Sequence, residues 1–203
     1  TLSLVTSTLA SSPIFNSFSS TENGGMAQNV ANNLISLGAE VDLHTNENWR
    51  EITKTRFVDR KTNYILLRED CNDDQYGRSD VKSLNYEDYD AVIISDYNKS
   101  FLTREDIEYI GSSHKLTFLD TKKSVQKWCE CVSFIKINDD EFKKAGTITK
   151  SLKDKLIITV GPEGSKHKGI HYPVPLVDIK DLAGAGDSYL SALVVKYVET
   201  KNI

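Results

Sequence analysis

Four short apolar runs in the second half of the chain constrain the fold more than any other feature of the sequence. They lie at residues 91–95, 116–119, 132–135 and 156–160, and each contains β-branched residues. Nearly continuous apolar runs of this length are typical of strands that are buried on both faces of a parallel sheet.

Segments with helical spacing of apolar residues lie between and around these runs, at residues 28–37, 103–110 and 187–198. Gly38 follows the first segment as a C-terminal stop. Thr103 is a candidate N-cap of the second, with Asp106 at the reciprocal position of a capping box. This alternation of strands and helices predicts a layered α/β fold.

One segment departs from the alternation. Residues 53–69 form two strand-like pieces around a polar turn at 59–63, which predicts an antiparallel hairpin inserted into the α/β scaffold. Together with the Ser/Thr-rich stretch 2–18, the hairpin is expected to form a small separate sheet. An exposed sheet of this kind suits a lid or a dimer surface.

Composition excludes several classes of protein. The chain has 203 residues with 25 Lys+Arg against 29 Asp+Glu, and this mildly acidic balance argues against a dedicated nucleic-acid binder. No stretch approaches the roughly 18 apolar residues of a membrane helix. The cysteines at 71, 129 and 131 form neither a disulfide framework nor a zinc site, which favours a cytoplasmic protein. Residues 1–20 lack the basic residues of a signal peptide, so we expect a longer reading frame or a removed initiator Met.

The most informative segment for function is Asp181-Leu-Ala-Gly-Ala-Gly-Asp187, directly before the last apolar helix. Glycines at a helix start let backbone amides converge on an anion, and the helix dipole adds positive potential there. Asp187 is poorly placed to bind phosphate itself but well placed to take a proton from an attacking hydroxyl. The alternative, a glycine turn with a helix-capping Asp, has about equal weight when the segment is taken alone.

Two other segments carry polar residues at expected helix starts. In Gly24-Gly25-Met-Ala-Gln-Asn29, the Asn29 amide suits sugar hydroxyls, although a loop with a capping glycine is the better explanation when the segment is taken alone. Asn138 and Glu141 follow a strand and lie on one helix face, where they could hold Mg²⁺ through waters. The alternative is a helix start enriched in acid for dipole reasons.

Taken in the order in which they occur along the chain, the three segments resemble the signatures of the PfkB (ribokinase-like) family of carbohydrate kinases. These signatures are G-G-x-A-x-N-x-A-x(6)-G, N-x-x-E and D-x-x-G-A-G-D. The resemblance implies a ribokinase-like three-layer α/β/α sandwich with a small β lid. It makes residues 1–203 a single, shortened domain with lid segments at about 1–20 and 53–69. It also implies an ATP-dependent, Mg²⁺-requiring kinase whose acceptor is a sugar or sugar phosphate.

The resemblance further implies roles for individual residues. Asp187 is the catalytic base, and the anion hole is formed by Gly184, Ala185 and Gly186. Asn138 and Glu141 bind Mg²⁺ through water and help to place the phosphate. The sugar pocket contains Gly25 and Asn29. Residues 159–164 resemble the loop that approaches the nucleotide through Gly161 and Gly164.

Within the family, the closest similarity is to the kinase domain of the heptose-phosphate kinase/ADP-heptose synthase enzymes of lipopolysaccharide precursor synthesis. Residues 95–99 are similar to its S-D-Y-x-K segment, 119–122 to its D-P-K, and 54–68 to its T-K-x-R…L-R lid. This similarity favours a heptose phosphate as substrate. It implies that Lys122 binds the nucleotide and that the substrate contacts Asp96, Lys99, Arg56 and Arg68. For each cation taken singly, a solvated surface charge is the better explanation.

The charge balance and the lack of a long apolar stretch argue against a nucleic-acid or membrane partner. The resemblance is compatible with a lid-mediated homodimer and with a nucleotidyltransferase domain, fused or separate. Against the family outline the chain is short at its start, middle and end, so a second hypothesis is a reduced, weakly active or inactive PfkB-like binding or assembly module. A dehydrogenase is excluded because residues 184–187 lack the third glycine of G-x-G-x-x-G and do not follow the first strand.

Overall fold

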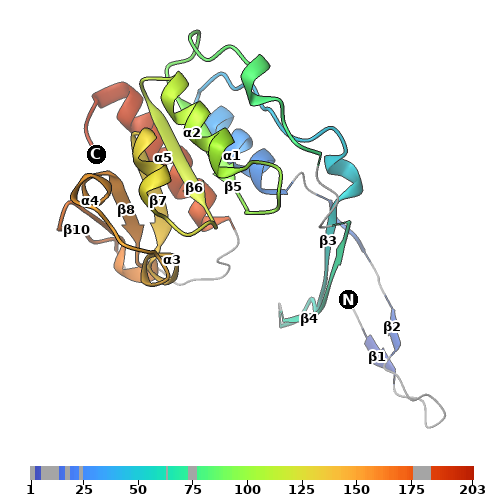
Figure 1. The fold of residues 1–203 in the computed structure, drawn as a ribbon. Helices are drawn as coiled ribbons and strands as arrows, with labels where there is room; N and C mark the ends of the chain where they lie inside the picture. Colours follow the sequence, from blue (N-terminus) through green and yellow to red (C-terminus); the bar gives the residue numbers. More distant parts are fainter. Residues whose placement is uncertain are drawn as a thin grey trace.

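The computed structural model describes residues 3–5, 14–16, 19–22, 25–62, 64–72, 77–175 and 184–203. Its centre is a six-stranded sheet in the order β10-β9-β8-β7-β6-β5 (Figure 1). The parallel strands are β5 (Val92–Asp96), β6 (Thr117–Thr121), β7 (Phe134–Asn138) and β8 (Leu156–Thr159). Two short strands, β9 (Ser165–His167) and β10 (Ile170–Tyr172), extend the sheet in antiparallel fashion. Each of the four apolar runs therefore contributes one parallel strand, as predicted.

Helices cover both faces of this sheet (Figure 1). One face packs against α1 (Gly25–Ser36) and α5 (Ala185–Thr200), where Val30, Phe118 and Leu190 are part of one buried cluster. The other face packs against α2 (Arg104–Ser113), α4 (Lys150–Lys155) and the 3-10 turns η2 (Val81–Ser83) and η3 (Lys127–Cys131). The short α3 (Asp139–Lys143) follows β7 directly, and single 3-10 turns form η1 (Trp49–Glu51) and η4 (Gly161–Glu163). The three-layer α/β/α sandwich is confirmed.

Local signals in the sequence place the helix ends. Thr103 caps α2 and Asp106 completes the capping box, with the Asp106 amide 3.1 Å from Thr103 Oγ1 and the Thr103 amide 2.8 Å from Asp106 Oδ2. Helix α1 ends just before Gly38, whose φ of +89° requires a left-handed conformation that glycine adopts without strain. Both predictions are confirmed.

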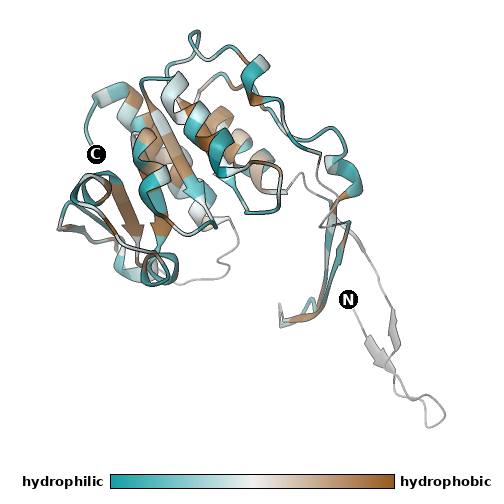
Figure 2. Ribbon diagram, in the orientation of Figure 1, coloured by the Kyte–Doolittle hydropathy of each residue, from teal (hydrophilic) through white to brown (hydrophobic). Residues whose placement is uncertain are grey.

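The predicted hairpin is also present. β3 (Thr53–Val58) and β4 (Ile65–Cys71) pair in antiparallel fashion, and the hairpin projects away from the α/β body (Figure 1). Hydrophobic residues lie mainly in the sheet and the helices that cover it, but some occur on the hairpin (Figure 2). The expectation of one joint sheet with the N-terminal stretch is wrong, because β1 (Ser3–Val5) pairs with β2 (Ile14–Asn16) in a separate two-stranded sheet.

Candidate active site

Several of the predicted site residues lie where the parallel strands end and α5 begins. The carboxyl ends of parallel strands meet at one edge of a sheet, which is where ligands bind in folds of this kind. Helix α5 starts after Gly184, whose φ is +77°, so a glycine is needed to turn the chain into the helix. Gly24 and residues 181–183 of the predicted motifs lie outside the described residues.

Asp187 is in the first turn of α5 and is only 7% exposed. Burial raises the pKa of its carboxyl group and the negative charge of Asp120 raises it further, whereas Asn29, Lys136 and Lys122 act in the opposite direction. A carboxylate with a raised pKa is a better proton acceptor than an exposed one. The environment of Asp187 is thus suited to a general base.

Helix α1 brings a second predicted residue to the same place. The Asn29 side chain hydrogen-bonds the Asp187 carboxylate and thereby lowers the pKa of that group. Two further polar contacts join the helices: Asn33 Nδ2 donates to Ser188 Oγ at 3.3 Å, and Ser191 Oγ donates to the Val30 carbonyl at 3.3 Å. Asn29, expected in the sugar pocket, therefore lies beside the candidate base. Gly25 is the first residue of α1.

A buried ion pair that the sequence analysis missed lies beneath Asp187. Lys136 Nζ on β7 donates to Asp120 Oδ2 on β6 at 2.8 Å, and the side chains are 6% and 4% exposed. The available signal was a lysine within the otherwise apolar strand Phe134–Asn138, because such a position is buried on both faces. Asp120 was considered only as part of the D-P-K-like segment.

Asn138 and Glu141 form a capping box at the start of α3. The Glu141 amide donates to Asn138 Oδ1 at 2.8 Å, and the Asn138 amide donates to Glu141 Oε2 at 2.9 Å. The other oxygen of Glu141 accepts a hydrogen bond from Lys122 Nζ, which joins three predicted residues. Both Glu141 oxygens therefore have protein donors, and the described residues contain no cluster of three His, Cys, Asp or Glu that could hold a metal directly.

The Asp96 carboxylate accepts several hydrogen bonds from described residues close to it. The donors are Thr121 Oγ1 at 2.6 Å, Lys123 Nζ at 2.7 and 2.8 Å, and the Asn98 amide at 3.0 Å. These contacts organise the loop that follows β5 and carries Lys99. The contact with the substrate that the sequence analysis expects of Asp96 stays a prediction.

Tyr97, in the same loop, is a second residue that the sequence analysis did not single out. Its side chain is 44% exposed, and Lys122 Nζ lies 5.7 Å from its ring centroid. Burial of part of the ring raises its pKa, as do the charges of Asp187 and Asp120, whereas Lys122 and Arg56 lower it. An aromatic ring therefore lies near both the candidate base and Arg56 of the hairpin.

Arg68 is paired in register with Arg56 on the hairpin, but its guanidinium is engaged locally. Its Nε and Nη2 each donate to Asp70 at 2.7 Å. A phosphate at Arg68 would compete with this carboxylate.

The expected nucleotide loop follows β8. Gly161 and Gly164 have φ values of +59° and +98°, and a Cβ on Gly164 would lie 2.1 Å from the Tyr172 carbonyl oxygen. Only glycine fits at 164, so the loop passes directly against the end of β10.

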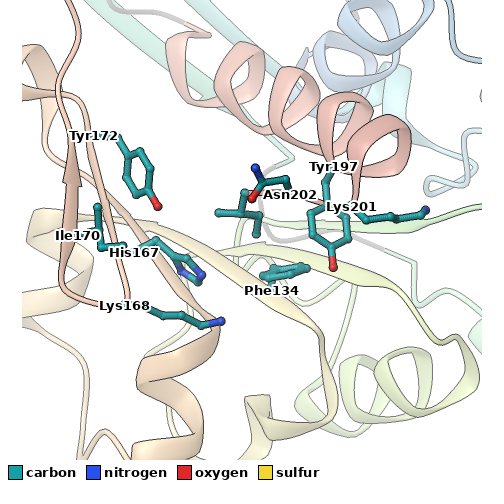
Figure 3. Close-up of a pocket in the computed structure, with 9 residues that line it drawn as sticks. Phe134, His167, Lys168, Ile170, Tyr172, Tyr197, Lys201 and Asn202 are labelled. Atoms are coloured by element: carbon teal, nitrogen blue, oxygen red, sulfur yellow. The ribbon is translucent and has the colours of Figure 1, made fainter.

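A cavity with a volume of about 280 Å³ lies elsewhere in the described part of the chain. Tyr172 and His167 of the β9–β10 hairpin face Tyr197 near the end of α5, with Phe134 between them (Figure 3). Because Phe134 begins β7 and Tyr197 lies more than two turns beyond Asp187, this cavity is at the opposite end of the sheet from the candidate base. No helix among the described residues has the length and apolar character required to cross a membrane.

Comparison with known proteins gives one family and a consistent set of relatives. Residues 43–203 match the model of the pfkB family of carbohydrate kinases. The bifunctional protein HldE of a Nitratiruptor species is 27% identical in an alignment 231 residues long, gaps included. The alignment covers 88% of this chain and 49% of that protein. The HldE proteins of Helicobacter acinonychis and Helicobacter pylori are 26% and 24% identical, and their alignments cover 88% and 94% of this chain and 51% and 53% of those proteins. The chain spans about half the length of these relatives.

Proposed function

The chain belongs to the pfkB family of carbohydrate kinases, and from that premise we propose that it transfers the γ-phosphoryl group of ATP to a hydroxyl of a sugar or sugar phosphate. The observation that carries the proposal is the buried carboxylate of Asp187, next to the glycine-initiated start of α5. Phosphoryl transfer needs positioning, stabilisation of charge and a group that accepts the hydroxyl proton.

In this proposal each part of the site has one task. The Gly184–Gly186 amides and the α5 dipole stabilise the charge on the transferring group, and Asp187 accepts the proton of the attacking hydroxyl. Mg²⁺, when bound, supplies further charge neutralisation of the ATP phosphates. Because both Glu141 oxygens have protein donors, Asn138 and Glu141 would hold the ion through water rather than directly.

We propose a heptose phosphate as the acceptor. The relatives named HldE and the S-D-Y-x-K-like segment support this choice. Arg56 lowers the pKa of Tyr97, so the hairpin contributes a cation near this ring, which supports the proposal that it acts as a lid over a sugar phosphate. Lys122 would bind the nucleotide, and Lys99 and Arg68 would bind the sugar phosphate. To do so, Arg68 would give up its contact with Asp70.

The hairpin also supports a proposal on assembly. Exposed apolar residues cluster at its turn and along β4, including Tyr64 (69% exposed), Ile65, Leu66 and Leu67. We propose that a second copy of the chain covers them in a lid-mediated homodimer. Because the relatives are named bifunctional, we propose a nucleotidyltransferase domain or partner as the second activity.

Turnover of a substrate panel tests the activity. Release of ADP is followed in a coupled assay with ATP, Mg²⁺ and heptose phosphates, hexose phosphates and unphosphorylated sugars, using the protein and its Asp187→Asn variant. We expect turnover of a heptose phosphate that the variant has lost. If no sugar in the panel is turned over in a manner that depends on Asp187, the kinase assignment is refuted.

One observation favours a second candidate, a binding or assembly module with weak or no activity. The alignment with the Nitratiruptor protein runs over 231 residues but covers only 88% of the 203 in this chain, so the relative carries additional residues within the matched region. Calorimetry with ATP·Mg²⁺ and with heptose phosphate separates the two candidates. A folded dimer that binds neither ligand would favour the module.

A further inference from the structure

A row of three polar residues crosses the central sheet beneath the start of α5. Ser95 on β5 is in register with Asp120 on β6, and Asp120 is in register with Lys136 on β7. Residues in register on neighbouring parallel strands point to the same face of a sheet, and residues two apart on one strand share that face. Phe118, two residues before Asp120, packs in the cluster beneath α1 and α5. The row therefore faces the α1/α5 layer.

The row has unused hydrogen-bonding capacity on both the donor and the acceptor side. Lys136 Nζ, with three hydrogens, makes one hydrogen bond within the described residues, to Asp120 Oδ2. Asp120 Oδ1 and Ser95 Oγ are buried, and neither has a partner in the described part of the chain. Buried polar groups of a folded protein are nearly always satisfied, so atoms left in this state indicate a water or ligand that belongs there.

The ammonium group also reaches the expected anion hole. A Cβ added to Gly186 would lie 2.8 Å from Lys136 Nζ, so the cation occupies the space that a side chain at 186 would take. Among the described residues, the charges of Lys136 and Lys122 lower the pKa of the Asp187 carboxyl group. A phosphoryl group at the first amides of α5 would therefore meet the Lys136 ammonium from the sheet side.

We propose that Lys136 neutralises the transferring phosphoryl group and that Asp120 is the positioning residue that holds its ammonium there. This deepens, and rests on, the proposed kinase function. Lys136 stays protonated throughout: the phosphorus–oxygen bond to ADP breaks, the bond to the sugar oxygen forms, and the hydroxyl proton goes to Asp187. The spare hydrogens of the ammonium then bond phosphoryl oxygens, while its contact with Asp120 keeps it in place.

Binding of inorganic pyrophosphate, measured by calorimetry, tests the proposal without requiring turnover. We expect Lys136→Met to weaken binding at least tenfold and Lys136→Arg to restore part of it. Asp120→Asn should have a smaller effect. The matched control Lys196→Met, at an exposed lysine of α5, should bind as the parent chain does. Because Lys136→Met leaves Asp120 buried without its partner, the double variant Lys136→Met/Asp120→Asn provides a fold in which both buried charges are gone.

Kinetics add a readout that a structural role would not move. With a turned-over sugar, we expect kcat to fall about 100-fold in Lys136→Met and less in Asp120→Asn, with KM for the sugar unchanged in both. A folded double variant that binds pyrophosphate like the parent chain would overturn the proposal, as would a parent chain that does not bind it. If the parent chain binds pyrophosphate and Lys136→Met binds it more weakly, but no sugar is turned over, the kinase function alone is refuted.

Discussion

Replacing Gly164 by alanine tests whether the loop after β8 is held against β10 as the structure indicates. Gly164 has φ +98° and ψ −127°, a region in which a side chain is strained by about 1–3 kcal/mol. Its Cβ would also lie 2.1 Å from the Tyr172 carbonyl oxygen, far inside contact distance, and forcing β10 aside costs about 1–3 kcal/mol more. We expect Gly164→Ala to lower the free energy of unfolding by about 4 kcal/mol, a large part of the roughly 5–15 kcal/mol of an ordinary domain.

Two other glycines separate the causes. Gly169 has φ +80° with nothing near its Cβ position, so Gly169→Ala should cost only about 1 kcal/mol of strain. Gly77 has no positive φ and no described residue within 4 Å of its Cβ position, and Gly77→Ala should change stability by less than about 0.5 kcal/mol. Urea denaturation followed by circular dichroism measures all three. If Gly164→Ala is no more destabilising than Gly169→Ala, the close approach to Tyr172 is refuted.

Three further predictions concern the site. Burial raises the pKa of the Asp187 carboxyl group above its value in the unfolded chain, so the ionised carboxylate destabilises the folded state at high pH. Asp187→Asn should therefore raise Tm at pH 8. The gain in Tm should vanish below about pH 4, where the carboxyl group is protonated in both the folded and the unfolded state. A Tm gain that is independent of pH would contradict this. Asn29→Ala removes a donor to the Asp187 carboxylate and should move the acidic limb of the kcat/KM profile up by about one pH unit, whereas Asn33→Ala should leave the limb in place. Equal shifts in the two variants would refute a direct effect of Asn29. Tyr97→Ala should raise KM for the sugar about tenfold with KM for ATP unchanged, and Tyr97→Phe should retain both values, because the exposed ring face supplies the contact; a loss in Tyr97→Phe equal to that in Tyr97→Ala would assign the effect to the hydroxyl instead.

The layered fold was predictable because burial on both faces leaves a direct trace in composition. The four apolar runs became β5 to β8, and the capping box of Thr103 and Asp106 marked the start of α2. A glycine can also mark a helix start, because Gly184 has the positive φ that the start of α5 requires. The N-terminal stretch was misjudged because short strands do not reveal which partner they pair with.

Much of the site could not be predicted, because its contacts depend on register between strands. Lys136 meets Asp120 only because β6 and β7 pair with these residues opposite each other, and no spacing along the chain encodes that. Asp96 belongs to a recognisable segment, but its carboxylate is occupied by Lys123, which lies beyond the next strand. For Asn138 and Glu141, the metal-binding and capping interpretations use the same three-residue spacing, and the described contacts are those of a cap.

The most direct test of the central claim is transfer of radiolabelled γ-phosphate from ATP to a heptose phosphate, with the product identified by mass. The account predicts a heptose carrying one additional phosphoryl group, formed by the parent chain and by Lys196→Met but not by Asp187→Asn. Transfer that persists in Asp187→Asn, or no transfer to any sugar by a chain that binds ATP·Mg²⁺, would contradict it.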